Sequence, residues 1–112
     1  MNIVNLSAAF LVLATMGSPA GANAGHQYIA SLPEGARNER LTEMLRQLPE
    51  PCVVQKNFFR GFDQKKAALW SVACANKKAY AIMINDDTNG STRIMDCKVL
   101  MDRAKVDCLT RI

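Results

Sequence analysis

Four cysteines are the residues whose chemistry is most sharply constrained by their spacing. Their separations of 22, 23 and 11 residues contain no C-x-x-C pair for redox exchange, no C-x-x-C-H for haem attachment and no close pair of zinc ligands. An even number of cysteines in an exported chain predicts two disulfides, formed in an oxidising compartment. Three connectivities are possible; we favour Cys97 with Cys108, which flank a predicted helix, leaving Cys52 with Cys74.

The single histidine, His26, limits both acid–base chemistry and metal binding. It falls in the segment from Gly25 to Ala30, which we expect to be an unfixed arm, so a catalytic triad would have to recruit an unstructured residue. If processing leaves Gly25 as the first residue, its free amine beside the imidazole of His26 could chelate Cu(II), a metal that favours nitrogen ligands. An exposed arm residue is the main expectation and copper binding a minor alternative; no cofactor is predicted.

The acidic residues form no pair suited to general acid–base catalysis. Asp86 and Asp87 lie in a turn sequence, where Asp side chains bond their own backbone. Glu39 and Glu43 lie on a predicted helix with balancing arginines, so nothing places them in the two different environments that paired catalytic carboxylates need. The chain also has no Gly-rich phosphate loop. We therefore predict a non-enzymatic protein.

The basic residues, in a chain of formal charge +4, fall into two groups. Arg60, Lys65 and Lys66 precede a predicted strand, and Lys77 and Lys78 follow it. At ~3.3 Å per residue the strand separates the groups by on the order of 30 Å, so they cannot form one pocket. Solvated surface charge is the main expectation, and binding of anionic surfaces such as lipid head groups or lipopolysaccharide by the first group is an alternative. No nucleic-acid partner is predicted, because the neighbouring phenylalanines are expected in the core rather than as stacking platforms.

An apolar segment at the N-terminus predicts export. The run from Ile3 to Met16 is too short for a ~20-residue membrane span and is ended by Gly17 and Pro19. Small residues suited to cleavage follow, with a cut after Ala22 or after Ala24. We predict a cleaved signal peptide over 1–24, a single small domain over 25–112 with no membrane span after cleavage, and a periplasmic or secreted location.

The segment from Ala67 to Asp86 is the β-hairpin around which the domain is expected to form. Alternating positions on both sides of a short polar break predict two strands. A two-residue turn at Asn76 and Lys77 would set Trp70 opposite Met83, whereas a three-residue loop over 76–78 would set it opposite Ile84. We favour the second register because it gathers the large side chains on one face: Trp70, Val72, Cys74, Tyr80, Ile82 and Ile84.

Helices are predicted on both sides of the strands. Ser31 and Glu34 resemble a capping box before a helix from Pro33 to Leu48. Asp96 is a good N-cap for a second helix. Further strands are expected at Cys52 to Arg60 and Thr92 to Met95. The predicted fold class is α+β: an antiparallel β-meander of three to four strands, with an N-terminal and a C-terminal helix, two disulfides and helices over one face. The apolar stripe of the first helix is Leu41, Met44, Leu45 and Leu48.

Three segments carry a family resemblance: W-S-V-A-C-A-N at 70–76, Y-A-I-M-I at 80–84 and G-S-T-R-I-M-D-C at 90–97. Together they resemble a group of small exported proteobacterial proteins with W-S-V-x-C-x-N-G, Y-x-V-x-I and G-S-T-x-V-x-D-C in the same order. The resemblance implies a shared fold and an exported location, and it implies no activity. Where the group has Gly after the Asn, this chain has Lys77, although a position with positive φ suits Gly far better.

These observations predict an exported, non-enzymatic small domain that binds an unknown protein or envelope component. The alternatives are an electrostatic binder of anionic envelope surfaces, through Arg60, Lys65 and Lys66, and a copper-binding N-terminal arm, through His26.

Overall fold

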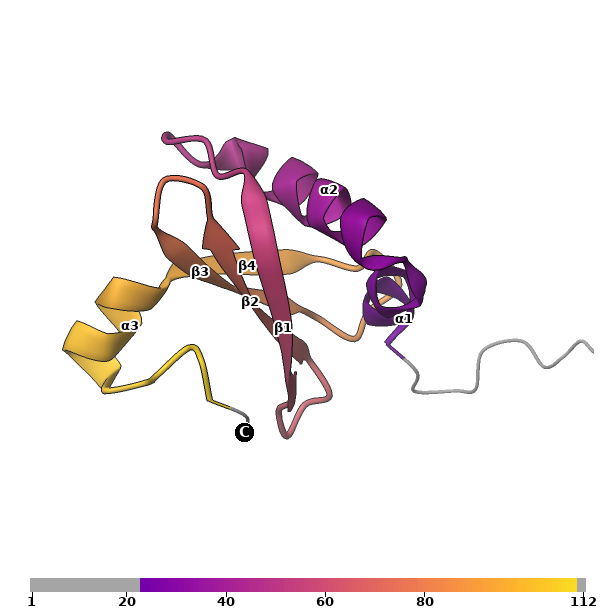
Figure 1. Cartoon of the computed structure of the whole chain (residues 1–112). Helices are drawn as coiled ribbons and strands as arrows, with labels where there is room; N and C mark the ends of the chain where they lie inside the picture. Colours follow the sequence, from indigo (N-terminus) through magenta and orange to yellow (C-terminus); the bar gives the residue numbers. More distant parts are fainter. Residues whose placement is uncertain (1–22, 111–112) are drawn as a thin grey trace, which may run out of the picture.

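The computed structural model describes residues 23–110, in which helices precede and follow a four-stranded antiparallel sheet (Figure 1). The strands follow one another across the sheet in the order β1-β2-β3-β4. The predicted α+β meander with an N-terminal and a C-terminal helix is confirmed. The elements are α1 Ala24–Ser31, α2 Glu34–Met44, the short 3-10 helix η2 Leu45–Gln47, β1 Val54–Phe62, β2 Ala68–Cys74, β3 Ala79–Ile84, β4 Thr92–Asp96 and α3 Cys97–Ala104.

The central hairpin has the predicted faces but neither of the predicted registers. Trp70 lies opposite Ile82, not opposite Ile84 or Met83. The loop has three residues, but they are 75–77 rather than 76–78, because the amide of Cys74 donates to the carbonyl of Lys78 at 2.8 Å. Moving the loop by one residue shifts each partner by two positions, which leaves every side chain on its expected face.

One side of the sheet, which we call the core face, carries the apolar interior. Trp70 and Val72 of β2 lie beside Ile82 and Ile84 of β3, and each is at most 3% exposed. The N-terminal helices pack over them (Figure 1). Two residues of the predicted helical stripe, Leu41 and Leu45, are fully buried, and the other two, Met44 and Leu48, pack at the edge of the core.

The start of the described chain differs from the prediction. Residues 25–30 are not an unfixed arm; they belong to helix α1, which begins after an Asn23 N-cap. The predicted capping box is also wrong, because Ser31 ends α1 and its hydroxyl donates to the carbonyl of Tyr28. Helix α2 begins after Pro33 without any side-chain cap. A helix of eight residues is marginal alone in water, so α1 depends on its tertiary contacts.

The opposite side of the sheet, which we call the second face, has its own cover, so the prediction of cover on one face only is wrong. Ser71 alternates with Trp70 and therefore projects from the second face. Its hydroxyl donates to the carbonyl of Cys108, in the C-terminal segment 105–110 that follows α3. Ser71 is 2% exposed and Cys108 3%, so this contact excludes water. Helix α3, capped by Asp96 as predicted, has no buried residue.

Both favoured disulfide pairings are confirmed. Cys52–Cys74 joins the segment before β1 to the end of β2, and Cys97–Cys108 joins the start of α3 to the C-terminal segment. No cysteine is free. Two disulfides indicate that the domain forms in an oxidising environment. Between residues 23 and 110, no helix is long and apolar enough to cross a membrane.

Candidate functional site

His26 is a buried core residue rather than an exposed arm residue. Its side chain lies among aromatic rings of the core face, with centroid distances of 4.5 Å to Phe59, 4.9 Å to Phe62 and 5.6 Å to Trp70. Only 6% of the residue is exposed. No local pattern predicts this burial, because the helix that carries His26 is stabilised by residues from distant strands.

The hydrogen bond between His26 and Trp70 defines the state of the imidazole. Trp70 Nε1 carries a hydrogen and can only donate, so at 3.1 Å from His26 Nδ1 it requires an unprotonated Nδ1. The neutral imidazole therefore carries its hydrogen on Nε2. Burial lowers the pKa of His26 below its ordinary value of 6.5, because the charged form loses hydration. Copper chelation through Nδ1 would require this hydrogen bond to break.

Arg37, which the sequence did not single out, ties α1 to α2. Its guanidinium donates to the carbonyls of Ile29, Ala30 and Leu32, at the end of α1, over distances of 2.8 to 3.3 Å. The same group lies 5.6 Å from the ring centroid of Trp70, within cation–π range. Arg37 thus satisfies carbonyls that a helix end leaves unpaired, and it covers the edge of the aromatic cluster.

Arg60, one of the three predicted anion-binding residues, is not on the surface. It is 6% exposed, and its guanidinium donates to the carbonyl of Thr110 at 2.8 Å and to that of Asp107 at 3.3 Å. Both acceptors belong to the C-terminal segment. Arg60 is therefore a structural residue that attaches this segment to the second face, and it is not available to a ligand.

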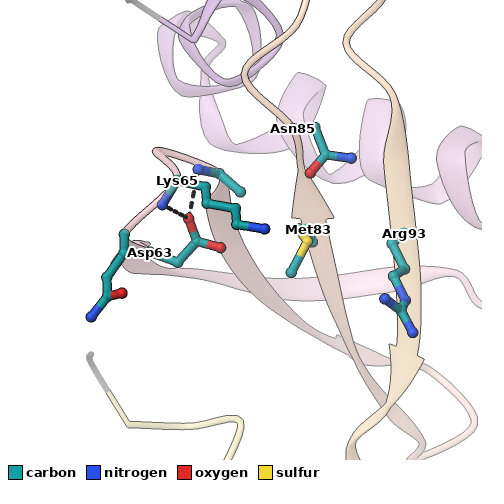
Figure 2. Close-up of a pocket in the computed structure, with 7 residues that line it drawn as sticks. Asp63, Lys65, Met83, Asn85 and Arg93 are labelled. Carbon is teal, nitrogen blue, oxygen red and sulfur yellow. Dashed lines mark hydrogen bonds between the residues drawn. The ribbon is translucent and has the colours of Figure 1, made fainter.

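The structure places Lys65 in a groove of about 470 Å³ on the second face, beside the turn that joins β1 to β2. The floor and far wall come from β3 and β4, where Met83 pairs with Arg93. Figure 2 shows Lys65 and Arg93 on opposite sides of Met83. Lys66 lies on the same turn and is exposed, but it does not line the groove. The groove is lined by Asp63, Gln64, Lys65, Ala67, Met83, Asn85 and Arg93.

The two cations of the groove have no partner among residues 23–110. Neither Lys65 Nζ nor the Arg93 guanidinium makes a hydrogen bond or ion pair there, and both residues are exposed. The carboxylate of Asp63 is occupied by the turn, because its Oδ1 accepts from the backbone amides of Lys65 and Ala67 at 2.8 and 2.9 Å (Figure 2). The local charge therefore favours an anion between Lys65 and Arg93.

The walls of the groove are held by hydrogen bonds within the fold. Asn85 donates its side-chain amide to the Ser91 hydroxyl at 3.1 Å and its backbone amide to the Ser91 carbonyl at 2.8 Å. The turn of Asp63 is closed by its backbone amide, which donates to the carbonyl of Ala67 at 2.9 Å. Because both walls are fixed without a ligand, binding would order mainly the two cationic side chains.

Sequence reasoning missed Arg93, Met83 and Asn85, and it included Arg60. Arg93 and Met83 come together through the register of β3 with β4, in which they lie opposite each other. Both side chains project from the face away from Ile82. Strand alternation alone predicts that Arg93 projects from the second face. It does not predict that the β1–β2 turn folds back to bring Lys65 beside it.

The turn that contains Asp86 and Asp87 uses the Asp87 carboxylate for hydrogen bonds to its own backbone. Asp87 Oδ1 accepts from the backbone amides of Asn89 and Ser91, each at 3.1 Å. The hydrogen bond from the Ser91 hydroxyl lowers the pKa of Asp87. Among residues 23–110, no group of three or more His, Cys, Asp or Glu side chains could hold a metal ion.

In comparisons with known proteins, no family model, no curated protein and no solved structure matches this chain.

Proposed function

We propose that this protein is an exported, non-enzymatic binding domain that recognises an anionic group of a cell-envelope component in the groove on its second face. The observation that carries the proposal is the pair Lys65 and Arg93, which flank Met83 and have no partner among residues 23–110. The disulfides and the predicted signal peptide support a periplasmic or secreted location. The resemblance to small exported proteobacterial proteins agrees with this location.

The chemistry of the groove suits a phosphate or carboxylate group attached to an apolar carrier. Arg93 can bind two oxygens of such a group at once, and Lys65 adds a mobile positive charge. Met83 provides an apolar, adaptable floor between them. A phosphorylated lipid head group matches both features, because its phosphate is carried by a glycerol that also bears hydrocarbon chains.

The test uses vesicles as the probe. Vesicles containing phosphatidylglycerol should retain the protein in co-sedimentation, and vesicles of phosphatidylcholine alone should not. Binding should weaken steeply between roughly 50 and 200 mM salt, because it depends on displaced counterions. Retention that is equal on both vesicle types, or that persists through the salt range, would exclude the proposal.

Substitutions locate the binding site. A Lys65→Gln and Arg93→Gln double variant should lose most of the vesicle binding, because both positive charges of the groove are removed. The matched control is Lys98→Gln with Arg103→Gln, which removes the same charge from α3, outside the groove. If the two variants lose binding equally, the protein responds to net charge and the groove is not the site.

A protein partner at α3 is a second candidate function. This helix has no buried residue, and three apolar side chains of α3 and the C-terminal segment are exposed: Val99 45%, Met101 44% and Leu109 71%. Such side chains gather in interfaces. Capture of an envelope protein that resists high salt and is lost in Met101→Ser, but is kept in the control Val53→Ser at a more exposed apolar position, would favour this candidate over the groove.

A further inference from the structure

Asn23, the first described residue, joins three parts of the fold. Its side-chain amide donates to the carbonyl of Ile84 at 2.8 Å, at the end of β3, and to the carbonyl of Lys66 at 3.1 Å, in the β1–β2 turn. Its Oδ1 accepts from the backbone amide of His26 at 3.0 Å, and its carbonyl accepts from that of Gln27 at 2.9 Å. Asn23 is 4% exposed, and its hydrogen bonds to Ile84 and His26 are buried.

These contacts make Asn23 part of the folded domain rather than part of a removable leader. Its Oδ1 is the N-cap of α1, the helix that carries His26 into the aromatic cluster. Without its amide, the carbonyl of Ile84 would lose this buried hydrogen bond. A chain that began at Gly25 would therefore lack both the helix cap and the connection between α1 and the strands.

The packing of Gly25 leads to the same conclusion. A Cβ atom placed on Gly25 would lie 2.9 Å from Cγ2 of Ile84, so the backbone here is closely packed on β3. A cut after Ala24 would put a charged α-amino group on this residue, inside the first turn of α1. That cut would start the chain within the closely packed first turn and remove the residue that caps it.

We propose that processing cleaves the bond between Ala22 and Asn23, so that the mature protein begins at Asn23. The inference depends on the predicted export and is independent of the groove. A signal-removing endopeptidase would add one water across this peptide bond, leaving a carboxylate on Ala22 and an amino group on Asn23. Ala20 and Ala22 supply the small residues that such an enzyme requires before the cut.

Cleavage before Asn23 would also remove the basis for copper binding by the N-terminus. With Asn23 first, His26 is the fourth residue, and the adjacent amine and imidazole of a Gly25–His26 terminus do not form. Its Nδ1 keeps the hydrogen bond from Trp70.

The experiment is export of the full 112-residue chain by a bacterium. Intact mass and N-terminal sequencing are then applied to the protein recovered from outside the cytoplasm. We expect Asn23 as the first residue. A chain that begins at Gly25 would overturn the inference and leave the groove proposal standing, whereas a chain that keeps its leader would overturn the predicted signal cleavage as well.

Two matched variants separate the two cleavage motifs. Ala20→Glu alters only the motif before Asn23, and Ala24→Glu alters only the motif before Gly25. We expect Ala24→Glu to be processed as the wild type and Ala20→Glu to be left uncut or cut after Ala24. The reverse pattern would overturn the inference. Any product of Ala20→Glu that begins at Gly25 should unfold several degrees below the wild type, because α1 has lost its cap.

Discussion

The two faces of the sheet are held by different kinds of interaction. On the core face, Leu41, Leu45 and Ile82 are fully buried, and full burial of such side chains is worth about 1.5–3 kcal/mol each. On the second face, the C-terminal segment is attached by hydrogen bonds from Arg60 and Ser71, which are worth about 0.5–1.5 kcal/mol each, or more for a charged donor. The core face therefore determines whether the domain folds, and the second face is free to carry a site.

The difference explains why the groove lies where it does. Polar attachment covers only part of the second face, so Met83 and Arg93 are left accessible beside the β1–β2 turn. A comparable opening on the core face would expose Trp70 and its neighbours. A domain with a single small core can thus place an open charged site only on the face that it does not need for folding.

Removal of each disulfide in turn should give the largest difference in stability between the two faces. The double variant Cys52→Ala with Cys74→Ala should lose roughly 3 kcal/mol of unfolding free energy, because a long loop is no longer closed and a buried bridge leaves the core. Cys97→Ala with Cys108→Ala should instead loosen α3 and the C-terminal segment locally. Chemical denaturation measures the first effect and amide hydrogen exchange the second. Equal losses of global stability would show that the two faces unfold as one unit.

Two arginines that bind backbone carbonyls offer the next comparison. Arg37→Met should cost about 2–3 kcal/mol, because it leaves the end of α1 unpaired beside the core. Arg60→Met should cost about 1–2 kcal/mol, because it releases only the C-terminal segment. Thermal unfolding ranks the two variants, with the exposed Arg46→Met as control. A larger loss for Arg60→Met would reverse the proposed roles of the faces.

Acid should weaken the core face and leave the second face intact. Because burial holds the pKa of His26 below 6.5, the unfolded chain takes up a proton first as the pH falls. The contribution of neutral His26 to the free energy of unfolding is complete above pH 6.5. It is lost as the pH falls toward the lower pKa of His26 in the folded state. Trp70 is the only tryptophan, so its fluorescence reports the change directly.

The matching variant is His26→Gln, which has no imidazole to protonate. It should remove the dependence of stability on pH in this window, although it lowers stability at neutral pH. If the slope between pH 5 and 7 is unchanged in His26→Gln, other groups are responsible for it.

The smallest effect on stability is expected at the β2–β3 loop, away from the packing on both faces of the sheet. Lys77 has φ 71°, in the left-handed region that favours glycine. Lys77→Gly should therefore stabilise the domain by about 1 kcal/mol, measured by chemical denaturation. Lys78→Gly is the control: its backbone φ is not positive, and the substitution should be destabilising. Stabilisation by both would point to a charge effect instead.

Pattern and spacing in the sequence predicted most of the fold. Alternation around Trp70 identified the face that is buried, although the favoured loop was displaced by one residue and the favoured register therefore by two. Asp96 capped α3 as expected, and the proximity of Cys97 to Cys108 led to both correct disulfide pairings. These features depend on neighbours in the sequence or on a simple period, which a single sequence displays directly.

The candidate site was only partly visible in the sequence. Lys65, predicted as an anion-binding residue, lines the groove. Arg60, predicted with it, does not, because the carbonyls of the C-terminal segment make its burial possible, whereas most arginines are exposed. Arg93 lies in the site because β4 pairs with β3 and because the β1–β2 turn, distant in sequence, folds beside it. Contacts of this kind have no local signature.

By itself, the sequence determined the class of the domain, the buried face of the hairpin, the disulfides and the predicted export. Only the tertiary structure decided that α1 forms, that His26 is buried beside Trp70 and that Lys65 and Arg93 share a groove. The physical reason is the distance along the sequence between the interacting residues. Periodicity, caps and turns express interactions between nearby residues, whereas an eight-residue helix and a shared charged site are stabilised by groups that folding brings together from distant parts of the chain.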